Sequence, residues 1–300
     1  MLCRRCGAKA VLKMERHNTS VCSICLEKYV LDQTARALRA HAMIQPTDRT
    51  LVAVSGGKDS LSLWHILLKL GYKTTGLYID QGIGDYSCVS RRKTEAFAAA
   101  HGLELKIHAL EAEEGAGVPE LAQLTHRPPC SVCGTMKRYN FNKIATDHGF
   151  DVVATGHNLD DEAARLLGNL LHWQDDYLTK QGPVLPKTHP QFVRKVKPLV
   201  RLAEREITAY AVTQRIDYVL EECPMAGGSK MLVFKDVLNR LEADAPGTKQ
   251  FFYFGFLARQ KPGEMDEADR ELRSCQRCGQ PTTAEVCGHC RLVEKVNILQ

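Results

Sequence analysis

The chain has 300 residues, enough for one large domain with small additions, and its 44 % hydrophobic and 25 % charged residues are typical of a globular protein. With 40 basic and 35 acidic residues, the net charge of +5 does not by itself indicate a nucleic-acid-binding protein. No apolar run approaches the roughly 18 residues of a membrane span, and the N-terminus lacks the apolar core of a secretory signal. We therefore expect a cytoplasmic protein without membrane association.

Two cysteine pairs, Cys3-x2-Cys6 and Cys22-x2-Cys25, lie near the N-terminus. Each Cys-x2-Cys turn points two thiolates at one ion, and two such turns complete a tetrahedron. Since a reducing compartment disfavours disulfides, the 12 cysteines of the chain indicate metal binding instead. The pattern predicts an N-terminal zinc module over residues 1–30, which is too poor in apolar residues to fold without its metal.

Short apolar segments then alternate with helical patterns. We expect strands at 51–54, 76–80, 103–109 and 152–155, and helices at 59–70, 87–101, 131–148 and 160–171. This alternation predicts an α/β fold, in which a parallel sheet has helices on both faces and binds ligands at the carboxyl ends of its strands. A loop rich in Glu, Gly and Pro is expected from 110 to 129. Residues 203–260 are expected to be mainly helical, with a last strand at 218–220.

The segment Ser55-Gly56-Gly57-Lys58-Asp59-Ser60 follows the first predicted strand and begins the first predicted helix. Its glycines allow a tight turn, and the helix N-terminus offers free N–H groups to an anion. Ser55, Lys58 and Ser60 add donors. The segment therefore predicts a phosphate-binding loop, but not a Walker A loop, because Asp59 follows the lysine. The Asp59 carboxylate suits Mg²⁺.

A second motif, Gly156-His157-Asn158-Leu159-Asp160-Asp161-Glu162, follows the fourth predicted strand. Gly156 allows the chain to pass close to a nucleotide, and Asp161 is a candidate for metal binding or proton transfer. Asp160 is expected to be the helix N-cap. His157 is as compatible with a structural role as with a ligand contact.

Three further cysteines, Cys130, Cys133 and Cys223, lie in the middle of the chain. Three thiolates leave a zinc tetrahedron one ligand short, but they suit a [4Fe–4S] cluster with one open iron. A persulfide mechanism, in which one cysteine carries sulfur and another resolves it, explains the same residues. The remaining cysteine, Cys88, is expected to be a buried thiol without a chemical role.

The last cysteines form Cys275-x2-Cys278 and Cys287-x2-Cys290, which predict a second zinc module over residues 272–300. Residues 31–271 are then the catalytic domain. Four basic clusters are candidates for phosphate contacts or for solvated surface, namely Arg4–Arg5, Arg91–Arg92–Lys93, Lys137–Arg138 and Arg194–Lys195–Lys197–Arg201.

The Ser-Gly-Gly-x-Asp-Ser loop resembles the PP-loop of ATP pyrophosphatases, and the second motif resembles the Gly-His-x-x-Asp-Asp motif of PP-loop tRNA-modifying enzymes. With its cysteine pattern, the whole chain resembles the TtuA-type tRNA 2-thiouridine synthetases and their relatives that thiolate the wobble uridine. The resemblance implies an adenine nucleotide alpha hydrolase-like, Rossmann-like PP-loop domain with zinc-ribbon-like modules at both ends. It also implies that the three central cysteines hold a [4Fe–4S] cluster and that Lys137 and Asp161 are catalytic. The nucleotide contacts it implies are Ala53, Ser55, Gly56, Gly57, Lys58, Asp59, Ser60, Ile79, Gly156 and Asp161.

The implied reaction is ATP-dependent 2-thiolation, in which ATP with Mg²⁺ adenylates O2 of a tRNA uridine, sulfur at the open iron attacks C2, and AMP leaves. The T-loop 5-methyluridine is favoured over the wobble uridine. The implied partners are tRNA, a ubiquitin-like sulfur carrier with a C-terminal thiocarboxylate (or sulfide), and a second copy of the chain.

Two alternatives remain. A PP-loop amidotransferase or lysidine-type ligase has no use for the three central cysteines. A zinc-ribbon RNA-binding protein with an inactive nucleotide site does not need the intact Ser55, Asp59 and Asp161.

Overall fold

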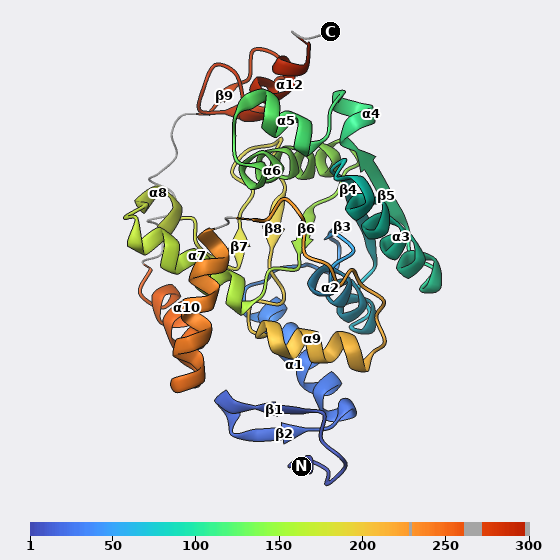
Figure 1. The fold of residues 1–300 in the computed structure, drawn as a ribbon, viewed down its shortest axis with the longest axis vertical. Coiled ribbons are helices and arrows are strands. Elements are labelled where there is room, and N and C mark those ends of the chain that lie inside the picture. The colour runs from blue at the N-terminus through green and yellow to red at the C-terminus, as the bar shows by residue number, and fades with distance from the viewer. Residues whose placement is uncertain (228–229, 261–271, 298–300) are drawn as a thin grey trace.

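The computed structural model describes residues 1–227, 230–260 and 272–297. Its centre is a six-stranded sheet in the order β5-β4-β3-β6-β8-β7, with helices on both faces (Figure 1). The strands are β3 (Thr50–Val54), β4 (Thr74–Asp80), β5 (Leu105–Ala109), β6 (Val152–Thr155), β7 (Val184–Leu185) and β8 (Arg194–Val196).

The first four strands are parallel, and they fall on the four segments that the sequence pattern predicts. The expected parallel sheet is present, and it departs from this pattern at one edge, where β7 pairs antiparallel with β8. A parallel pair needs a crossover of about a dozen residues or more, and only residues 186–193 join these two strands.

The predicted strand at 218–220 is also wrong, because these residues form no regular element. The backbone N–H of Val219 donates instead to the carbonyl oxygen of Gly56 over 2.9 Å, so this segment binds a loop rather than a strand.

Four of the helices in the middle of the chain match the predicted ones within a few residues: α2 (Lys58–Lys69), α3 (Gly84–Ala100), α6 (Pro129–Asp147) and α7 (Leu159–Leu171). The later part is mainly helical, as expected, with α9 (Glu204–Thr213), α10 (Lys230–Asp244) and α11 (Thr248–Leu257). A short helix that the sequence pattern did not indicate, α8 (Asp175–Leu178), follows α7.

The expected loop from 110 to 129 is wrong, because it contains α4 (Leu110–Glu114) and α5 (Val118–Thr125). Gly115 ends α4 with a φ of +79°, and a proline lies in the first turn of α5. The glycines and prolines therefore mark the ends of two short helices rather than a continuous loop.

Hydrophobic side chains pack on both faces of the sheet. Strand β3 shows the alternation, because Leu51 packs with α5 and α6 while Val52 and Val54 pack with α2, α7 and α9. The α2 side chain Trp64 is fully buried, and a Cβ at Gly76 of β4 would lie 2.4 Å from its ring. Helix α2 is therefore pressed directly onto the sheet, which fixes the loop that precedes it.

The two terminal segments lie at opposite ends of the molecule (Figure 1). The N-terminal one contains β1 (Leu12–Met14), η1 (Glu15–His17) and β2 (Thr19–Val21), and continues into α1 (Ser23–Ala40), which packs on α9. The C-terminal one contains β9 (Arg273–Ser274), β10 (Pro281–Thr282) and α12 (Gly288–Asn297). Helix α12 packs on α5 and α6 through the buried Leu292 and Val296. The predicted end of the catalytic domain, residue 271, lies outside the described residues.

Among the described residues, no helix combines the length and the hydropathy needed to cross a membrane.

Candidate active site

A cavity of about 430 Å³ lies at the carboxyl ends of β3, β4 and β6, where ligands bind in sheets of this kind. It brings together side chains that are far apart in the sequence. The lining residues that the sequence predicts are Ala53, Ser55, Gly57, Asp59, Ser60, Ile79, Cys130, Cys133, Lys137, Gly156, Asp161 and Cys223. Two other predicted residues, Gly56 and Lys58, lie beside the cavity rather than on its wall.

The loop between β3 and α2 is shaped for an anion. Gly56 has a φ of +75°, and a Cβ there would lie 2.6 Å from the carbonyl oxygen of Ser90, so only glycine fits. The Ser60 hydroxyl accepts from the Ser55 N–H over 3.0 Å and closes the turn. The N-cap of α2 is Gly57, which has no side chain to cap the first turn, and the N–H groups of that turn are therefore open to a ligand such as phosphate.

The second motif touches this loop directly. A Cβ at Gly156 would lie 2.9 Å from the backbone of Asp59 and Ser60, so the two motifs meet backbone to backbone. The N-cap of α7 is Asn158, whose side chain accepts from the Asp161 N–H while the Asp161 carboxylate accepts from the Asn158 N–H.

The prediction that Asp160 is the N-cap is therefore wrong. The Asp160 carboxylate is buried and binds the Lys249 ammonium, and it also accepts from the Glu204 backbone N–H over 2.8 Å. It fastens the first turn of α7 to α9 and α11, leaving Asp161 on the cavity wall.

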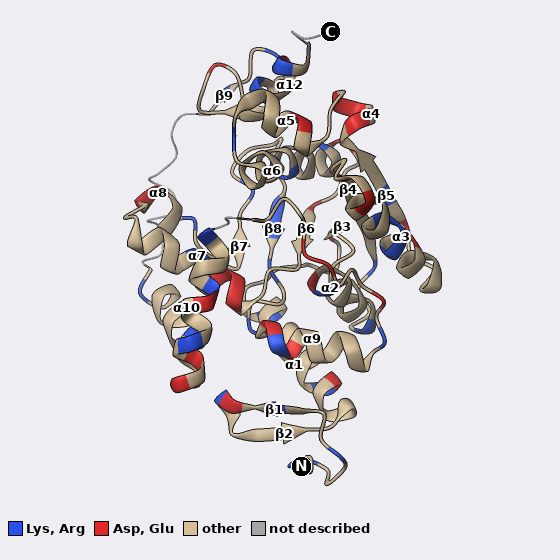
Figure 2. Ribbon diagram, in the orientation of Figure 1, with Lys and Arg blue, Asp and Glu red and all other residues tan. Residues whose placement is uncertain are grey.

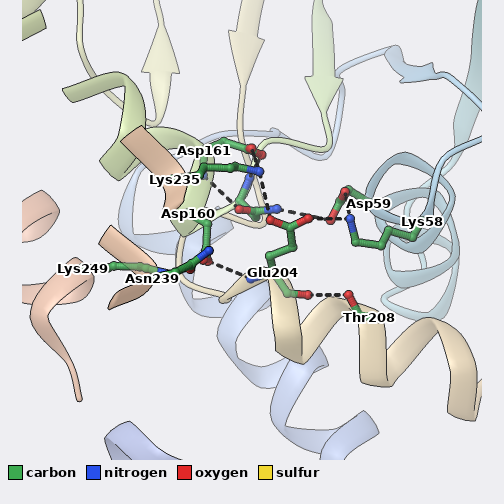
Figure 3. A network of polar contacts seen from close by, with 10 residues as sticks. Lys58, Asp59, Asp160, Asp161, Glu204, Thr208, Lys235, Asn239 and Lys249 are labelled. Atoms are coloured by element: carbon green, nitrogen blue, oxygen red, sulfur yellow. Dashed lines mark hydrogen bonds and ion pairs between the residues drawn. The ribbon is translucent and has the colours of Figure 1, made fainter. Parts of the chain in front are cut away.

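Behind the cavity wall, lysines and carboxylates alternate where α2, α7, α9 and α10 approach one another (Figures 2 and 3). The Lys58 ammonium binds Glu204 at 2.6 Å and Asp59 at 3.1 Å. The Lys235 ammonium binds Asp161 at 2.6 Å and Glu204 at 2.9 Å. Sequence reasoning missed Glu204 and Lys235, because they belong to no motif and reach the site only through the packing of α9 and α10.

The pKa values of Asp59 and Glu204 shift in opposite directions. Burial raises the pKa of Asp59 against the opposing charge of Lys58, with Asp161 adding to the rise. Burial also opposes ionisation of Glu204, but hydrogen bonds and charge from Lys58 and Lys235 outweigh it and lower its pKa to about 2. Glu204 is therefore a fixed anion at neutral pH.

His157 lines the same cavity and contacts the Thr155 hydroxyl through Nδ1 at 2.8 Å. Burial, followed by the charge of Arg165, lowers its pKa to about 4, so the ring is neutral at pH 7.

Cys130 and Cys133 line the cavity from the start of α6, and Cys223 lines it from a later segment. Cys133 donates to the Gln81 side-chain oxygen over 2.8 Å, and the Cys130 thiol lies 3.6 Å from the Met225 carbonyl oxygen. Burial and the neighbouring Cys133 and Cys223 raise the pKa of Cys130, while Lys137, one turn beyond Cys133 on the same helix, opposes the rise. The three thiols and the lysine therefore share one electrostatic environment.

The terminal cysteines form two compact groups, Cys3, Cys6, Cys22 and Cys25, and Cys275, Cys278, Cys287 and Cys290, with all ligand atoms of each within 4.8 Å of one another. Cys6 lies 3.5 Å from Cys22 and 3.7 Å from Cys25, and Cys278 lies 3.7 Å from Cys287, sulfur to sulfur. A tetrahedron with metal–sulfur bonds of about 2.3 Å has edges of about 3.8 Å, so each group fits one tetrahedral ion.

The structure also places Cys88 and the basic cluster 194–201. Cys88 is exposed rather than buried, because the buried face of α3 is formed by its neighbours Ser87 and Ser90. Two members of the basic cluster 194–201 are held in ion pairs. Lys197 is 6 % exposed and binds Glu162, and Arg194 binds Asp48, so these two are neither solvated surface nor free for phosphate.

Comparisons with known proteins fit this geometry. Residues 26–224 match the PP-loop domain family. The tRNA-5-methyluridine(54) 2-sulfurtransferase of Thermus thermophilus is 48 % identical, over 99 % of this chain and 92 % of that protein. The protein of the same name from Pyrococcus horikoshii is 41 % identical, over 97 % of this chain and 93 % of its own length.

Among solved structures, the U34-tRNA thiolase NcsA from Methanococcus maripaludis with its [4Fe–4S] cluster superimposes with a TM-score of 0.83 at 25 % identity, covering 98 % of this chain and 96 % of that one. Sequence identity over nearly the whole length, the matching domain and the shared fold all agree. The chain belongs to the PP-loop tRNA 2-sulfurtransferase family.

Proposed function

We propose that this protein uses ATP to adenylate O2 of a tRNA uridine and then replaces that oxygen with sulfur. The observation that carries the proposal is one cavity lined by a phosphate-binding loop, two carboxylates and three cysteines. A ligase that uses an amine needs the loop and the carboxylates, but it gives no reason for three thiols on the same wall.

The nucleotide half of the site is proposed to bind ATP with Mg²⁺. Ser55, Gly57 and Ser60 and the uncapped α2 N-terminus would hold the phosphates, while backbone at Ala53 and Ile79 would lie beside the adenine. Gly56 would allow the close approach of the loop. Asp59 and Asp161 supply the hard oxygen ligands that Mg²⁺ prefers.

The thiol half is proposed to hold a [4Fe–4S] cluster on Cys130, Cys133 and Cys223. Among the described residues, these three sulfurs do not all lie within 4.8 Å of one another as the sulfurs of each terminal group do, and a wider spacing suits a cluster better than one ion. When bound, such a cluster offers one iron without a protein ligand, which can carry sulfide.

Lys137 is proposed to stabilise negative charge that develops on the uracil oxygen or on phosphate, because it lines the cavity one helical turn beyond Cys133. Asp161 is proposed to bind metal or to assist proton transfer. The terminal cysteine groups are proposed to be structural zinc sites, since four thiolates leave no open position for chemistry.

For the substrate we propose 5-methyluridine 54 of tRNA, because relatives named for that nucleotide are 48 % and 41 % identical, whereas the thiolase named for U34 is 25 % identical. The sulfur donor is proposed to be a ubiquitin-like protein with a C-terminal thiocarboxylate, or sulfide in its place.

A homodimer is proposed as well. Val233, Val237 and Leu241 form an exposed apolar stripe along α10, spaced four residues apart. Trp173, which follows α7, is also exposed. These exposed apolar side chains support a contact with another protein chain. Light scattering on the purified protein measures the oligomeric state.

The proposed function is tested on protein purified without oxygen. We expect about four irons and two zincs per chain, and tRNA 2-thiouridine that forms only with ATP and a sulfur source, with pyrophosphate released. Two zincs without iron, even after reconstitution, would favour the persulfide route, or a sulfur-free ligase if no thiouridine forms. If Cys223→Ala keeps both its cluster and full thiolation, the assignment of the third ligand is wrong.

A further inference from the structure

Six residues on the wall of the nucleotide cavity and behind it form a closed ring of polar contacts, drawn in part in Figure 3. Each of its three carboxylates uses one oxygen for each neighbour in the ring. In order, the members are Asp59, Lys58, Glu204, Lys235, Asp161 and Asn158. Asn158 closes the ring, because its backbone N–H donates to Asp161 over 3.0 Å and its side-chain amide donates to Asp59 over 3.2 Å.

The ring members differ in what they face. Asp59 and Asp161 line the cavity, whereas Lys58, Glu204 and Lys235 stand behind them and are not among the lining residues. All five charged side chains are between 20 % and 32 % exposed, so water only partly screens them. The two acids on the cavity wall are thus held by groups that are not part of that wall.

Two carboxylates on one wall repel each other, and such repulsion turns or protonates one of them unless cations offset it. Each acid here has its own lysine, and Glu204 lies between the two ammonium groups and binds both.

We propose that Lys235 and Glu204 are positioning residues for the adenylation step. Lys235 fixes the carboxylate of Asp161, and Glu204 holds Lys235 and Lys58 at a set separation, which keeps Asp59 and Asp161 oriented toward Mg·ATP. The inference rests on the proposed use of ATP by this site. It gives α10 a role in the nucleotide site although no residue of α10 touches the cavity.

The test compares Lys235→Met and Lys235→Arg with Arg240→Met on the same helix. Arg240 is a matched control, since it also loses one positive charge but lies at the surface, paired only with Asp236 among the contacts of the described residues. Binding of Mg·ATP is measured by calorimetry, pyrophosphate release by steady-state kinetics with tRNA, and folding by thermal unfolding.

Lys235→Met is expected to weaken Mg·ATP binding and to lower kcat for pyrophosphate release about 10- to 100-fold, the size of effect that a misplaced group produces. Lys235→Arg is expected to recover most of both, and Arg240→Met to behave like the wild type. Unchanged binding and turnover in Lys235→Met overturn the proposal.

A double-mutant cycle separates positioning from a merely structural role. If Lys235 acts through Asp161, Asp161→Asn with Lys235→Met is no worse than Asp161→Asn alone in Mg·ATP binding and in kcat. Additive losses overturn the proposal. A wild type that binds Mg·ATP but never thiolates tRNA defeats the proposed function, while the binding cycle still decides the role of Lys235.

Discussion

In both terminal modules four thiols lie within 4.8 Å of one another, whereas the three central thiols are spread over the wall of a cavity of about 430 Å³. The four cysteines of each terminal group come from one short stretch of the chain. The central thiols come from α6 and from the segment after residue 220, and they share their cavity with the phosphate loop. A closed site can therefore be predicted from local cysteine spacing, whereas an open site is assembled from distant parts of the chain.

Cys223→Ala tests whether the central cysteines act independently of the terminal groups. We expect it to lower tRNA thiolation more than about 100-fold and to prevent full iron loading, because two thiolates are too few to hold a [4Fe–4S] cluster. Zinc content and the melting temperature should stay close to those of the wild type. Metal analysis with thiouridine quantification checks this, and a loss of zinc in this variant would contradict the independence of the sites.

The reverse experiment is Cys275→Ser with Cys278→Ser. We expect one zinc fewer per chain and a melting temperature lower by several degrees, because α12 loses the metal that holds its module together and covers α5 and α6 less well. Cys88→Ser, at an exposed cysteine outside all three groups, is the control. Full zinc content in the double variant would rule out this site.

Two glycines with nearly the same φ separate the effect of backbone strain from that of close packing. Gly56 in the central loop and Gly7 in the N-terminal cysteine turn have φ values of +75° and +77°, but only a Cβ at Gly56 meets other atoms. We expect Gly7→Ala to cost about 1–2 kcal/mol in the free energy of unfolding, from strain alone. Gly56→Ala should cost more and abolish ATP binding. Denaturant unfolding and nucleotide titration measure both, and equal effects of the two substitutions would contradict the close approach.

Glu204 is expected to make the free energy of unfolding depend on pH, with a small effect. The lowered pKa of Glu204, about 2 against an ordinary 4.5, stabilises the fold above pH 4.5, and this stabilisation is lost as the pH falls toward 2. Glu204→Gln should therefore be less stable than the wild type at pH 6, by no more than about 2 kcal/mol given its partial exposure. The gap should narrow below pH 4.5. Thermal unfolding of both proteins across this range checks the sign, and a constant gap would contradict it.

Sequence patterns predict the sheet well where strands are buried on both faces. β3, β4 and β6 are such strands, with glycine-ended helices between them, and the edge strand β5 is recognised although its residues are only partly buried. The patterns fail where structure depends on distant partners. The edge strand β7 is two residues long and follows from its pairing with β8. α4 and α5 are short and broken by glycine, so their periodicity is too brief to recognise.

The residues of the site divide in the same way into those that local motifs predict and those that depend on distant partners. Loop residues such as Ser55 and Gly156 belong to contiguous motifs, and the cavity contains them. Asn158 takes the cap that sequence reasoning gives to Asp160, because Asp160 is bound by Lys249 from α11. Nothing near Lys235 in the sequence indicates that α10 brings it to Asp161.

The seating of α12 on α5 and α6 has a consequence for protein synthesis. Leu292 and Val296 complete the apolar cluster beneath the helix that carries Cys130 and Cys133, yet the ribosome makes them long after that helix. While the chain is still being translated, this face of α6 is uncovered. We expect the enzyme to acquire its final cysteine geometry only after translation has passed α12, so that assembly of a metal centre there is a late event in the life of the nascent chain.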